Sequence, residues 1–290
     1  MHTDTTRALL EITGEDGVSF LQGLLTQDVT HLKPERALYA ALLSPQGKVQ
    51  HDFFLFAQGD AILMDIAAAQ KDTLLKKFSM YKLRAKVALR DASADWRVAY
   101  RTRAEHPAVG HCTAKKGVVL VTDPRAAELG ERLYLHDAQL SVKNTASMDA
   151  YHQHRIALGV PDSTDILDDV AMDAGLDALG AISFTKGCYV GQEVTARMHY
   201  KNIARKGFYG VQGETRLPAF GTPLMAGSVT LGTLRGSQGA CGLALLKFEE
   251  VEAALRAGTP ITVDNMPVAL KPPAWLQPKL AQFRAARENQ

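Results

Sequence analysis

Three features of the sequence predict an α+β fold that is followed by a small all-β domain. Strand-like and helical patterns alternate over residues 8–135, and further helical patterns cover residues 147–158 and 193–200. Beyond residue 206, glycine and proline punctuate short apolar runs. Frequent turns between short strands favour a β-barrel or a β-sandwich for this last part of the chain.

The first block contains a predicted hairpin and a short helix. Apolar residues at 8–12 predict a strand, and the spacing of Val18, Leu21 and Leu25 predicts a helix after Gly14. Turn residues at 44–47 separate two strand-like runs, which predicts a β-hairpin. The hairpin strands are expected at 38–43 and 49–56, and the remaining elements are a strand at 61–66, a helix at 67–80 and strands at 85–89, 97–100, 118–121 and 132–135.

In the middle of the chain, the helix predicted at 147–158 ends at Gly159, with Pro161 just beyond it, as helix stop signals require. An acidic loop is expected at 162–177, and a second helix at 193–200.

Composition limits the class of protein. A chain of 290 residues has room for two or three domains. Lys and Arg number 33 against 31 Asp and Glu, so the net charge gives no case for a polyanionic partner. No apolar run approaches the roughly 20 residues of a membrane span, and we expect no membrane partner.

The cysteines and the N-terminus point to a compartment. Cys112, Cys188 and Cys241 are odd in number and widely spaced, which suits a reducing environment and offers no C-x-x-C pairing for zinc. Residues 1–7 lead directly into an apolar segment and have no signal-peptide or Arg-rich presequence pattern. We expect a cytoplasmic bacterial protein; the alternative is a mitochondrial matrix protein that has lost its targeting segment.

Cys188 is the most informative residue because glycines bracket it, at positions 187 and 191. Glycine allows backbone conformations and close approaches that a Cβ would obstruct. Lys186 and the N-terminus of the predicted helix would favour the thiolate form of Cys188. The alternative interpretation is a small buried hydrophobic residue, the commonest role of a lone cysteine.

The residues around Cys188 carry a resemblance to a known family. The stretch reads Ile182-Ser183-Phe184-Thr185-Lys186-Gly187-Cys188-Tyr189-Val190-Gly191-Gln192-Glu193 and continues with Ala196-Arg197. Weaker matches are Phe20-Leu21-Gln22-Gly23-Leu24-Leu25-Thr26-Gln27-Asp28-Val29, Ser44-Pro45-Gln46-Gly47-Lys48 and Leu176-Asp177. Together they resemble the YgfZ family of folate-binding iron-sulfur cluster assembly proteins, which has mitochondrial Iba57-like members and is related to the glycine cleavage T-protein.

The resemblance implies a fold and a function. The fold would have three lobes around a central folate-sized cavity: residues 1–45 with 140–202, residues 46–139, and a C-terminal β-barrel at 203–290. The function would be assembly or repair of iron-sulfur clusters in client enzymes, some of which modify tRNA. The implied partners are iron-sulfur assembly proteins and these clients, and the implied cofactor is tetrahydrofolate or a one-carbon derivative.

Two positions bear on T-protein chemistry. Asp52 matches the second acidic position of the T-protein hairpin, and His51 replaces the first. Asp52 would hydrogen-bond the pterin or stabilise a cationic intermediate; the alternative is an exposed strand residue. Ala157 stands where T-protein offers an acid to the pterin. This argues against aminomethyl transfer from a lipoyl carrier.

The resemblance and the local chemistry together give a set of site residues. Cys188 and Asp52 are the predicted catalytic residues, with Cys188 as a transient iron ligand or a redox nucleophile. One cysteine cannot hold a cluster that needs about four ligands, so no stably bound metal is expected. The predicted cofactor-binding residues are Asp52, Lys186, Tyr189, Gln192, Glu193 and Arg197.

Alternatives remain for the helix after Cys188 and for the function. Glu193 and Arg197 would otherwise form a simple i,i+4 ion pair, and His152, His154 and His199 are left unassigned. The basic strip Arg197, Lys201, Arg205 and Lys206 would meet a folate tail or RNA phosphates, or merely be solvated. The alternative functions are a folate-dependent one-carbon transferase of the aminomethyltransferase type and a tRNA-binding accessory protein. Direct nucleic-acid binding is the less favoured choice, because no RNA-binding module is recognised.

Overall fold

The computed structural model describes residues 2–102, 107–136, 142–201 and 204–288. The contacts divide the chain into two compact units. Unit 1 comprises Met1–Tyr151 with Leu179–Gln192, and unit 2 comprises His152–Ala178 with Glu193–Gln290. The predicted lobe boundaries at 139/140 and 202/203 lie outside the described residues. The division into three lobes stays a prediction.

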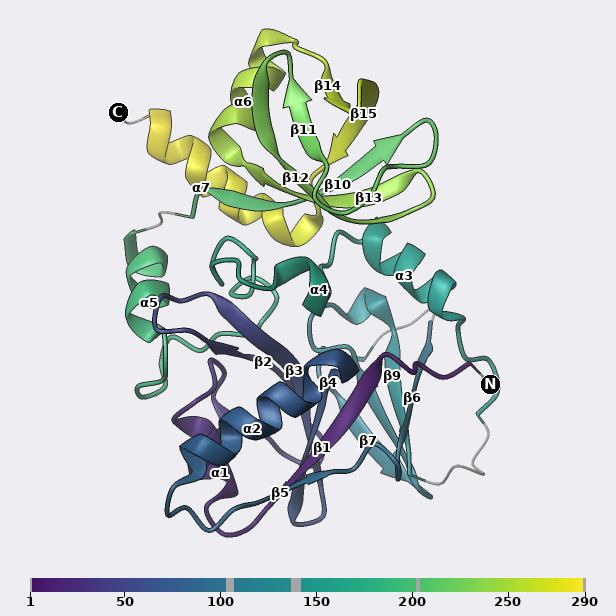
Figure 1. Ribbon diagram of the computed structural model, residues 1–290, viewed down its shortest axis with the longest axis vertical. Helices are drawn as coiled ribbons and strands as arrows, with labels where there is room; N and C mark the ends of the chain where they lie inside the picture. The colour runs from purple at the N-terminus through teal and green to yellow at the C-terminus, as the bar shows by residue number, and fades with distance from the viewer. Residues whose placement is uncertain (1, 103–106, 137–141, 202–203, 289–290) are drawn as a thin grey trace. The chain divides into compact units, whose positions relative to one another are not determined.

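A five-stranded antiparallel sheet forms the centre of unit 1, with two helices against one face (Figure 1). Its strand order is β2 (Leu38–Leu43), β3 (Val49–Gln58), β4 (Ala61–Ala67), β1 (Arg7–Thr13) and β5 (Ala88–Asp91). The helices are α1 (Gly17–Gln22) and α2 (Lys71–Lys82), with short 3₁₀ turns at Val29–His31 and Ala68–Gln70. The predicted hairpin is confirmed as β2 and β3.

The two faces of this sheet pack against different layers. Phe53 and Leu55 of β3 point to the helices and share a core with Leu74 and Phe78 of α2. Phe56 points the other way and stacks on Tyr134, with ring centroids 4.2 Å apart. Tyr134 belongs to a second antiparallel sheet, in the order β6 (Arg97–Arg101), β9 (Glu131–Leu135), β8 (Val118–Thr122) and β7 (Cys112–Lys115), with a 3₁₀ turn at Ala127–Leu129. β7 is not predicted from the sequence, because three of its four side chains are exposed and leave no apolar alternation.

Charged side chains are buried between the two sheets. Arg132 is 2% exposed, and its Nη2 lies 2.8 Å from Oδ2 of the fully buried Asp65. Arg7 Nε donates to the other carboxylate oxygen at 2.6 Å. Burial alone would raise the pKa of Asp65, but the two guanidinium groups outweigh it and the pKa is lowered. The network therefore ties β1, β4 and β9 together through an ionised carboxylate.

The helices that lie between the sheets and the barrel in the sequence follow local signals. Helix α3 (Met148–Ala157) ends just before Gly159, as predicted. Gly159 has φ +71°, and a Cβ there would lie 2.6 Å from Pro273 Cβ, so only glycine fits. The acidic loop contains a helical turn that was not predicted, α4 (Ser163–Ile166), which a capping box between Asp162 and Asp165 initiates. The predicted helix after Cys188 is confirmed as α5 (Gln192–Lys201).

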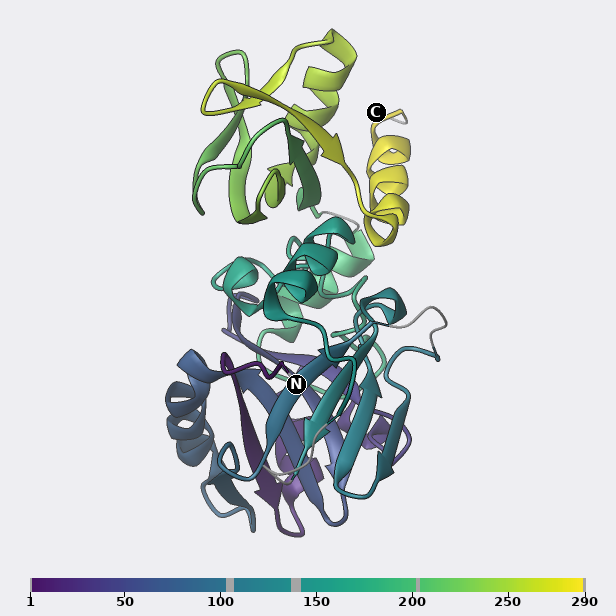
Figure 2. The ribbon, with the colours of Figure 1, turned by 90° about the vertical axis from the view of Figure 1, so that its right-hand side faces the viewer.

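The C-terminal part is a closed six-stranded β-barrel, so of the two sequence predictions the barrel is confirmed. Two further helices that the sequence analysis does not predict pack on it. Phe248, Val251 and Ala254 form the buried stripe of α6 (Phe248–Ala257), and Leu280 of α7 (Gln277–Glu288) joins the same core. Figure 2 shows both helices beside the strands of the barrel. The strand order is β10 (Lys206–Gly213), β13 (Cys241–Lys247), β12 (Val229–Gln238), β11 (Pro223–Ala226), β14 (Ile261–Val263) and β15 (Met266–Lys271), with a 3₁₀ turn at Ala274–Leu276.

Over the described ranges, none of the helices combines the length and the apolar character needed to cross a bilayer.

Candidate functional site

The Cys188 loop, residues 179–191, packs in unit 1 against the turn of the β2–β3 hairpin. Gly191 has φ +82°, and a Cβ there would lie 2.5 Å from the carbonyl oxygen of Ser44 and 2.9 Å from Leu43 Cβ. The turn itself closes with hydrogen bonds from Gly47 N to Ser44 O, 2.9 Å, and from Ser44 N to Lys48 O, 2.8 Å. Two motifs that are far apart in the sequence are therefore in direct contact, and Gly191 permits that contact.

Thr26 brings a third motif to the same place. Its buried hydroxyl donates to Ala181 O at 2.6 Å and accepts from Ala41 N at 2.9 Å. Its carbonyl oxygen accepts from Ser183 N at 3.0 Å. All three of these motifs, near Thr26, at the hairpin turn and around Cys188, thus converge in unit 1.

Lys186 is directed inward and holds the loop. The side chain is 8% exposed, and its ammonium donates to the carbonyl oxygens of Gln22 at 2.7 Å, Leu25 at 2.7 Å and Gln27 at 3.0 Å. An ammonium has three N–H donors, and all three are used here. Desolvation lowers the pKa of Lys186 to about 8, against the opposing effect of Asp28. These contacts give the residue a structural role; its expected roles at the thiol or at a ligand tail stay predictions.

Cys188 is the exposed cysteine of the three. The structure therefore excludes the interpretation of this thiol as a buried hydrophobic residue. Cys112 is buried, which raises the pKa of its thiol to about 11, and Cys241 Sγ contacts Gln212 Oε1 at 3.1 Å. The two glycines around Cys188 differ. Nothing lies within 4 Å of a Cβ built on Gly187, so close packing requires a glycine at position 191 but not at position 187.

Asp52 is fully buried, which excludes the alternative of an exposed strand residue. Its Oδ2 accepts a hydrogen bond from the Tyr39 hydroxyl at 3.0 Å, and the Tyr39 ring stacks on Phe54 with centroids 5.1 Å apart. His51, the next residue along β3, projects to the opposite face, where Nδ1 lies 3.1 Å from Gln70 Oε1. Burial lowers the pKa of His51 although this contact opposes the shift.

The other predicted ligand-binding residues differ in accessibility. Tyr189 is 7% exposed, and its ring lies 5.3 Å from Lys186 Nζ. Gln192 is half-buried, and its backbone N–H reaches Tyr189 O at 3.3 Å. Glu193 and Arg197 are exposed on α5, and no ion pair joins these two described residues. Both side chains are therefore accessible to a ligand.

No resident metal site is evident in the part of the chain that the structure describes, where no three His, Cys, Asp or Glu side chains form a suitable group. His152 and His154 are half-buried on α3, and His199 is exposed on α5.

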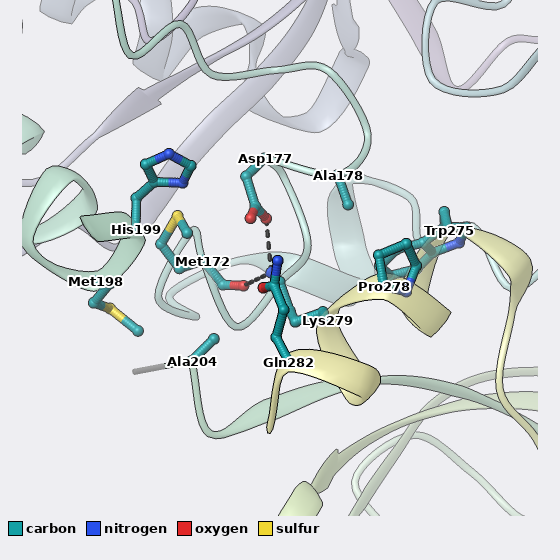
Figure 3. Close-up of a pocket in the computed structure, with 10 residues that line it drawn as sticks. All are labelled: Met172, Asp177, Ala178, Met198, His199, Ala204, Trp275, Pro278, Lys279 and Gln282. Carbon is teal, nitrogen blue, oxygen red and sulfur yellow. Dashed lines mark hydrogen bonds and ion pairs between the residues drawn. The ribbon is translucent and has the colours of Figure 1, made fainter. Parts of the chain in front are cut away.

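Unit 2 contains a cavity of about 600 Å³ that the sequence analysis does not predict (Figure 3). An ion pair lies in it: Lys279 Nζ donates to Asp177 Oδ1 at 2.8 Å and to Met172 O at 2.8 Å. None of the predicted cofactor-binding residues is among the described residues that line it. Asp177 and His199 both lie in segments that stand out in the sequence, but only the fold brings them beside α7. The lining residues are Met172, Asp177, Ala178, Met198, His199, Ala204, Trp275, Pro278, Lys279 and Gln282.

Comparison with known proteins gives consistent results. Residues 205–278 match the model of the CAF17 C-terminal beta-barrel domain. The human protein "Iron-sulfur cluster assembly factor IBA57, mitochondrial" is 32% identical over 86% of this chain and 78% of its own length. Its mouse counterpart is 30% identical over 91% of this chain and 85% of its own. The crystal structure of glycine cleavage system aminomethyltransferase T from Bartonella henselae superposes with a TM-score of 0.70, covering 94% of this chain and 84% of that one at 14% identity, a likeness of fold.

Proposed function

The chain belongs to the IBA57/CAF17 family of iron-sulfur cluster assembly factors, whose fold is related to that of the glycine cleavage T-protein, and on this basis we propose how it works. Its role is the assembly or repair of iron-sulfur clusters in specific client enzymes, and Cys188 is the residue that binds the cluster. The observation that carries the proposal is an exposed thiol on a loop whose flanks are fixed.

The flanks of the loop restrict where the thiol can go. Before Cys188, the Lys186 ammonium is anchored to three backbone carbonyl groups; after it, Gly191 is seated on the hairpin turn. Cysteine binds iron as its thiolate. A cluster needs about four ligands, so the cluster is cargo, and a second protein supplies the remaining ligands. Assembly proteins and the client enzymes are the partners in this exchange.

Tetrahydrofolate, or a one-carbon derivative, is the small molecule of the proposal. The T-protein-like fold supports it, as does the carboxylate of Asp52 with its Tyr39 hydrogen bond, because a pterin presents N–H groups to such an acceptor. When bound, the folate supplies a carrier of one-carbon units. The residues fit it in part. Arg197 and Glu193 are accessible, whereas Asp52 is fully buried, the donors of Lys186 are used and Ala157 offers no acid.

The remaining parts of the proposal rest on family membership. The clients include tRNA-modifying iron-sulfur enzymes, and the protein does not need to turn over a substrate of its own. Ala157 disfavours the aminomethyl transfer of T-protein, since no carboxylate at that position can hold the pterin.

Complementation tests this function. Cys188→Ala and Cys188→Ser are expressed in cells that lack the native copy, and the activities of several iron-sulfur enzymes are measured. We expect both variants to fail, and the matched control Cys241→Ala, a half-buried thiol of the barrel, to restore activity. Full activity with Cys188→Ala would contradict the thiol role. Turnover of 5,10-methylene-tetrahydrofolate with an added acceptor would instead support a transferase.

A further inference from the structure

The cavity in unit 2 holds polar groups whose hydrogen-bonding capacity is not used within the described chain. Lys279 Nζ uses two of its three donors, on Asp177 Oδ1 and Met172 O. This leaves one N–H of the ammonium and the second oxygen of the Asp177 carboxylate. The indole N–H of Trp275 is also buried, without a hydrogen-bond partner among the described residues. Buried polar groups normally have partners, so the Trp275 N–H points to a ligand, and the partly exposed Lys279–Asp177 pair offers it further polar contacts.

The walls of the cavity suit a flat ring. Met172 and Met198 provide thioethers, and Trp275 and Pro278 provide flat apolar surfaces (Figure 3). Gly175 fixes the indole, because a Cβ there would lie 2.5 Å from Trp275 Cζ3. A volume of about 600 Å³ is in the range of small-molecule sites.

The ion pair presents an acceptor next to a donor. A carboxylate oxygen accepts from N–H groups, and the neighbouring ammonium donates to a carbonyl oxygen. The complementary edge carries a ring N–H and an amino group beside a C=O. Guanine and pterin both have this 2-amino-4-oxopyrimidine edge, whereas adenine presents a different pattern.

Exposed cations lie on the chain segment that forms one wall. Arg197, Lys201 and Arg205 are exposed, and none of them forms an ion pair with another described residue. Lys201 lies three residues after the wall residue Met198 on α5, so the two side chains are helical neighbours. Arg197 lies four residues before Lys201, on the same face. A ring in the cavity would therefore have cations within reach of an anionic tail.

We propose that this cavity binds a heterocycle with a 2-amino-4-oxopyrimidine edge and an anionic tail. Asp177 and Lys279 read the edge, Trp275 and the methionines hold the ring, and Arg197 with Lys201 meets the tail. A guanine nucleotide, free or unpaired in RNA, and a folate carry this chemistry. The folate source rests on the proposed function but would place the pterin here rather than at Asp52; the nucleotide source is independent of that function.

Isothermal titration calorimetry on the full chain tests the site with GMP, guanosine, AMP and 5-formyltetrahydrofolate. We expect GMP or the folate to bind, and AMP to bind at least tenfold more weakly than GMP because it lacks the edge. Ala178→Trp fills the cavity from its exposed rim and abolishes binding. Asp177→Asn weakens it at least tenfold, as expected for a charge-assisted acceptor.

A pair of matched charge reversals tests the tail. Arg197→Glu with Lys201→Glu weakens GMP about tenfold and leaves guanosine unchanged, since guanosine has no phosphate. Lys76→Glu with Arg84→Glu, at exposed positions of unit 1, makes the same change in net charge and leaves both probes unchanged. GMP binding that folate does not displace assigns the site to a nucleotide; folate binding that Ala178→Trp abolishes assigns it to a pterin.

The proposal is overturned by the absence of binding of either probe at millimolar concentration, or by equal binding to Ala178→Trp and the wild type. Folate binding that survives Ala178→Trp but is lost in Asp52→Asn would overturn this site and leave the proposed function standing. Cys188→Ala is expected to bind both probes normally, so a failure of the thiol role is seen separately.

Discussion

Gly191 lies so close to Ser44 that a Cβ on the glycine would be 2.5 Å from the serine carbonyl oxygen. The contact joins the end of the Cys188 loop to the turn of the β2–β3 hairpin. Because the backbone of Gly191 is also in the left-handed region, with φ +82°, a side chain is disfavoured there both by conformation and by space. The position of Cys188 therefore depends on a hairpin far away in the sequence.

Gly191→Ala is expected to destabilise unit 1 by about 2 to 4 kcal/mol, since it adds left-handed strain to a clash with backbone. Chemical denaturation measures the loss. Gly187→Ala is the matched control: a Cβ there meets nothing within 4 Å, and we expect a change within about 0.5 kcal/mol. Equal effects at the two glycines would contradict the packing argument.

Lys186→Met is expected to loosen the Cys188 loop, because three carbonyl groups, at the end of α1 and just beyond it, lose their donor while the aliphatic stem is kept. Amide hydrogen exchange over residues 181–191 should speed up, and it should not change in the barrel. Lys71→Met, which removes the exposed ion pair with Asp91, is the control. Unchanged exchange in Lys186→Met would show that these three hydrogen bonds are not needed to hold the loop.

The same lysine gives a pH dependence of stability. Its folded pKa, about 8, lies below the ordinary value of 10.5, so between these values the unfolded chain binds the extra proton. The free energy of unfolding then rises with pH across this window, and Lys186 contributes up to about 3 kcal/mol to the rise. The free energy of unfolding of the wild type minus that of Lys186→Met isolates the contribution. We expect this difference to increase from pH 7 to pH 10; a flat or falling difference would contradict the lowered pKa.

Local signals in the sequence predict much of the fold. The turn residues at 44–47 locate the β2–β3 hairpin, and Gly159 with Pro161 locates the end of α3, because each signal acts over a few residues. Frequent glycine and proline predict the barrel. The same pattern does not reveal α6, because the apolar stripe of Phe248, Val251 and Ala254 comes between two strands of the barrel in the sequence. β7 gives no pattern, since its side chains are mostly exposed.

The site is predicted less completely, because its geometry depends on contacts between distant segments. The sequence marks Cys188 and Lys186, but the direction of the ammonium is decided by carbonyl groups about 160 residues earlier. Sequence alone also leaves the burial of Asp52 open, and the folded structure shows it fully buried beside Tyr39. The cavity of unit 2 forms where α7 meets residues 172–178, so no local motif announces it.

Cys188 is expected to be the first cysteine that iodoacetamide modifies at neutral pH, because exposure and thiolate content set the rate. Burial raises the pKa of Cys112 to about 11, which keeps that thiol protonated and shielded. Mass spectrometry of the folded protein should show one rapid alkylation, absent from Cys188→Ser. If 5-formyltetrahydrofolate slows this alkylation, the folate lies near the thiol; rapid alkylation of Cys112 would contradict the buried placement.

Arg132→Met is expected to destabilise unit 1 by about 3 to 5 kcal/mol, the usual loss when one partner of a buried ion pair is removed. Asp65 would keep Arg7 but lose the guanidinium 2.8 Å from its Oδ2.

The lowered pKa of Asp65 also gives a pH dependence. The contribution of this carboxylate to the free energy of unfolding is present above the ordinary carboxyl pKa and is lost as pH falls through the lowered value. Arg132→Met should therefore show a smaller loss of stability than the wild type between pH 5 and pH 3. Arg90→Met, which removes exposed pairs with Glu11 and Asp95, is the control and should change the stability far less. If the two arginine variants lose equal stability, the buried network does not tie the sheets together.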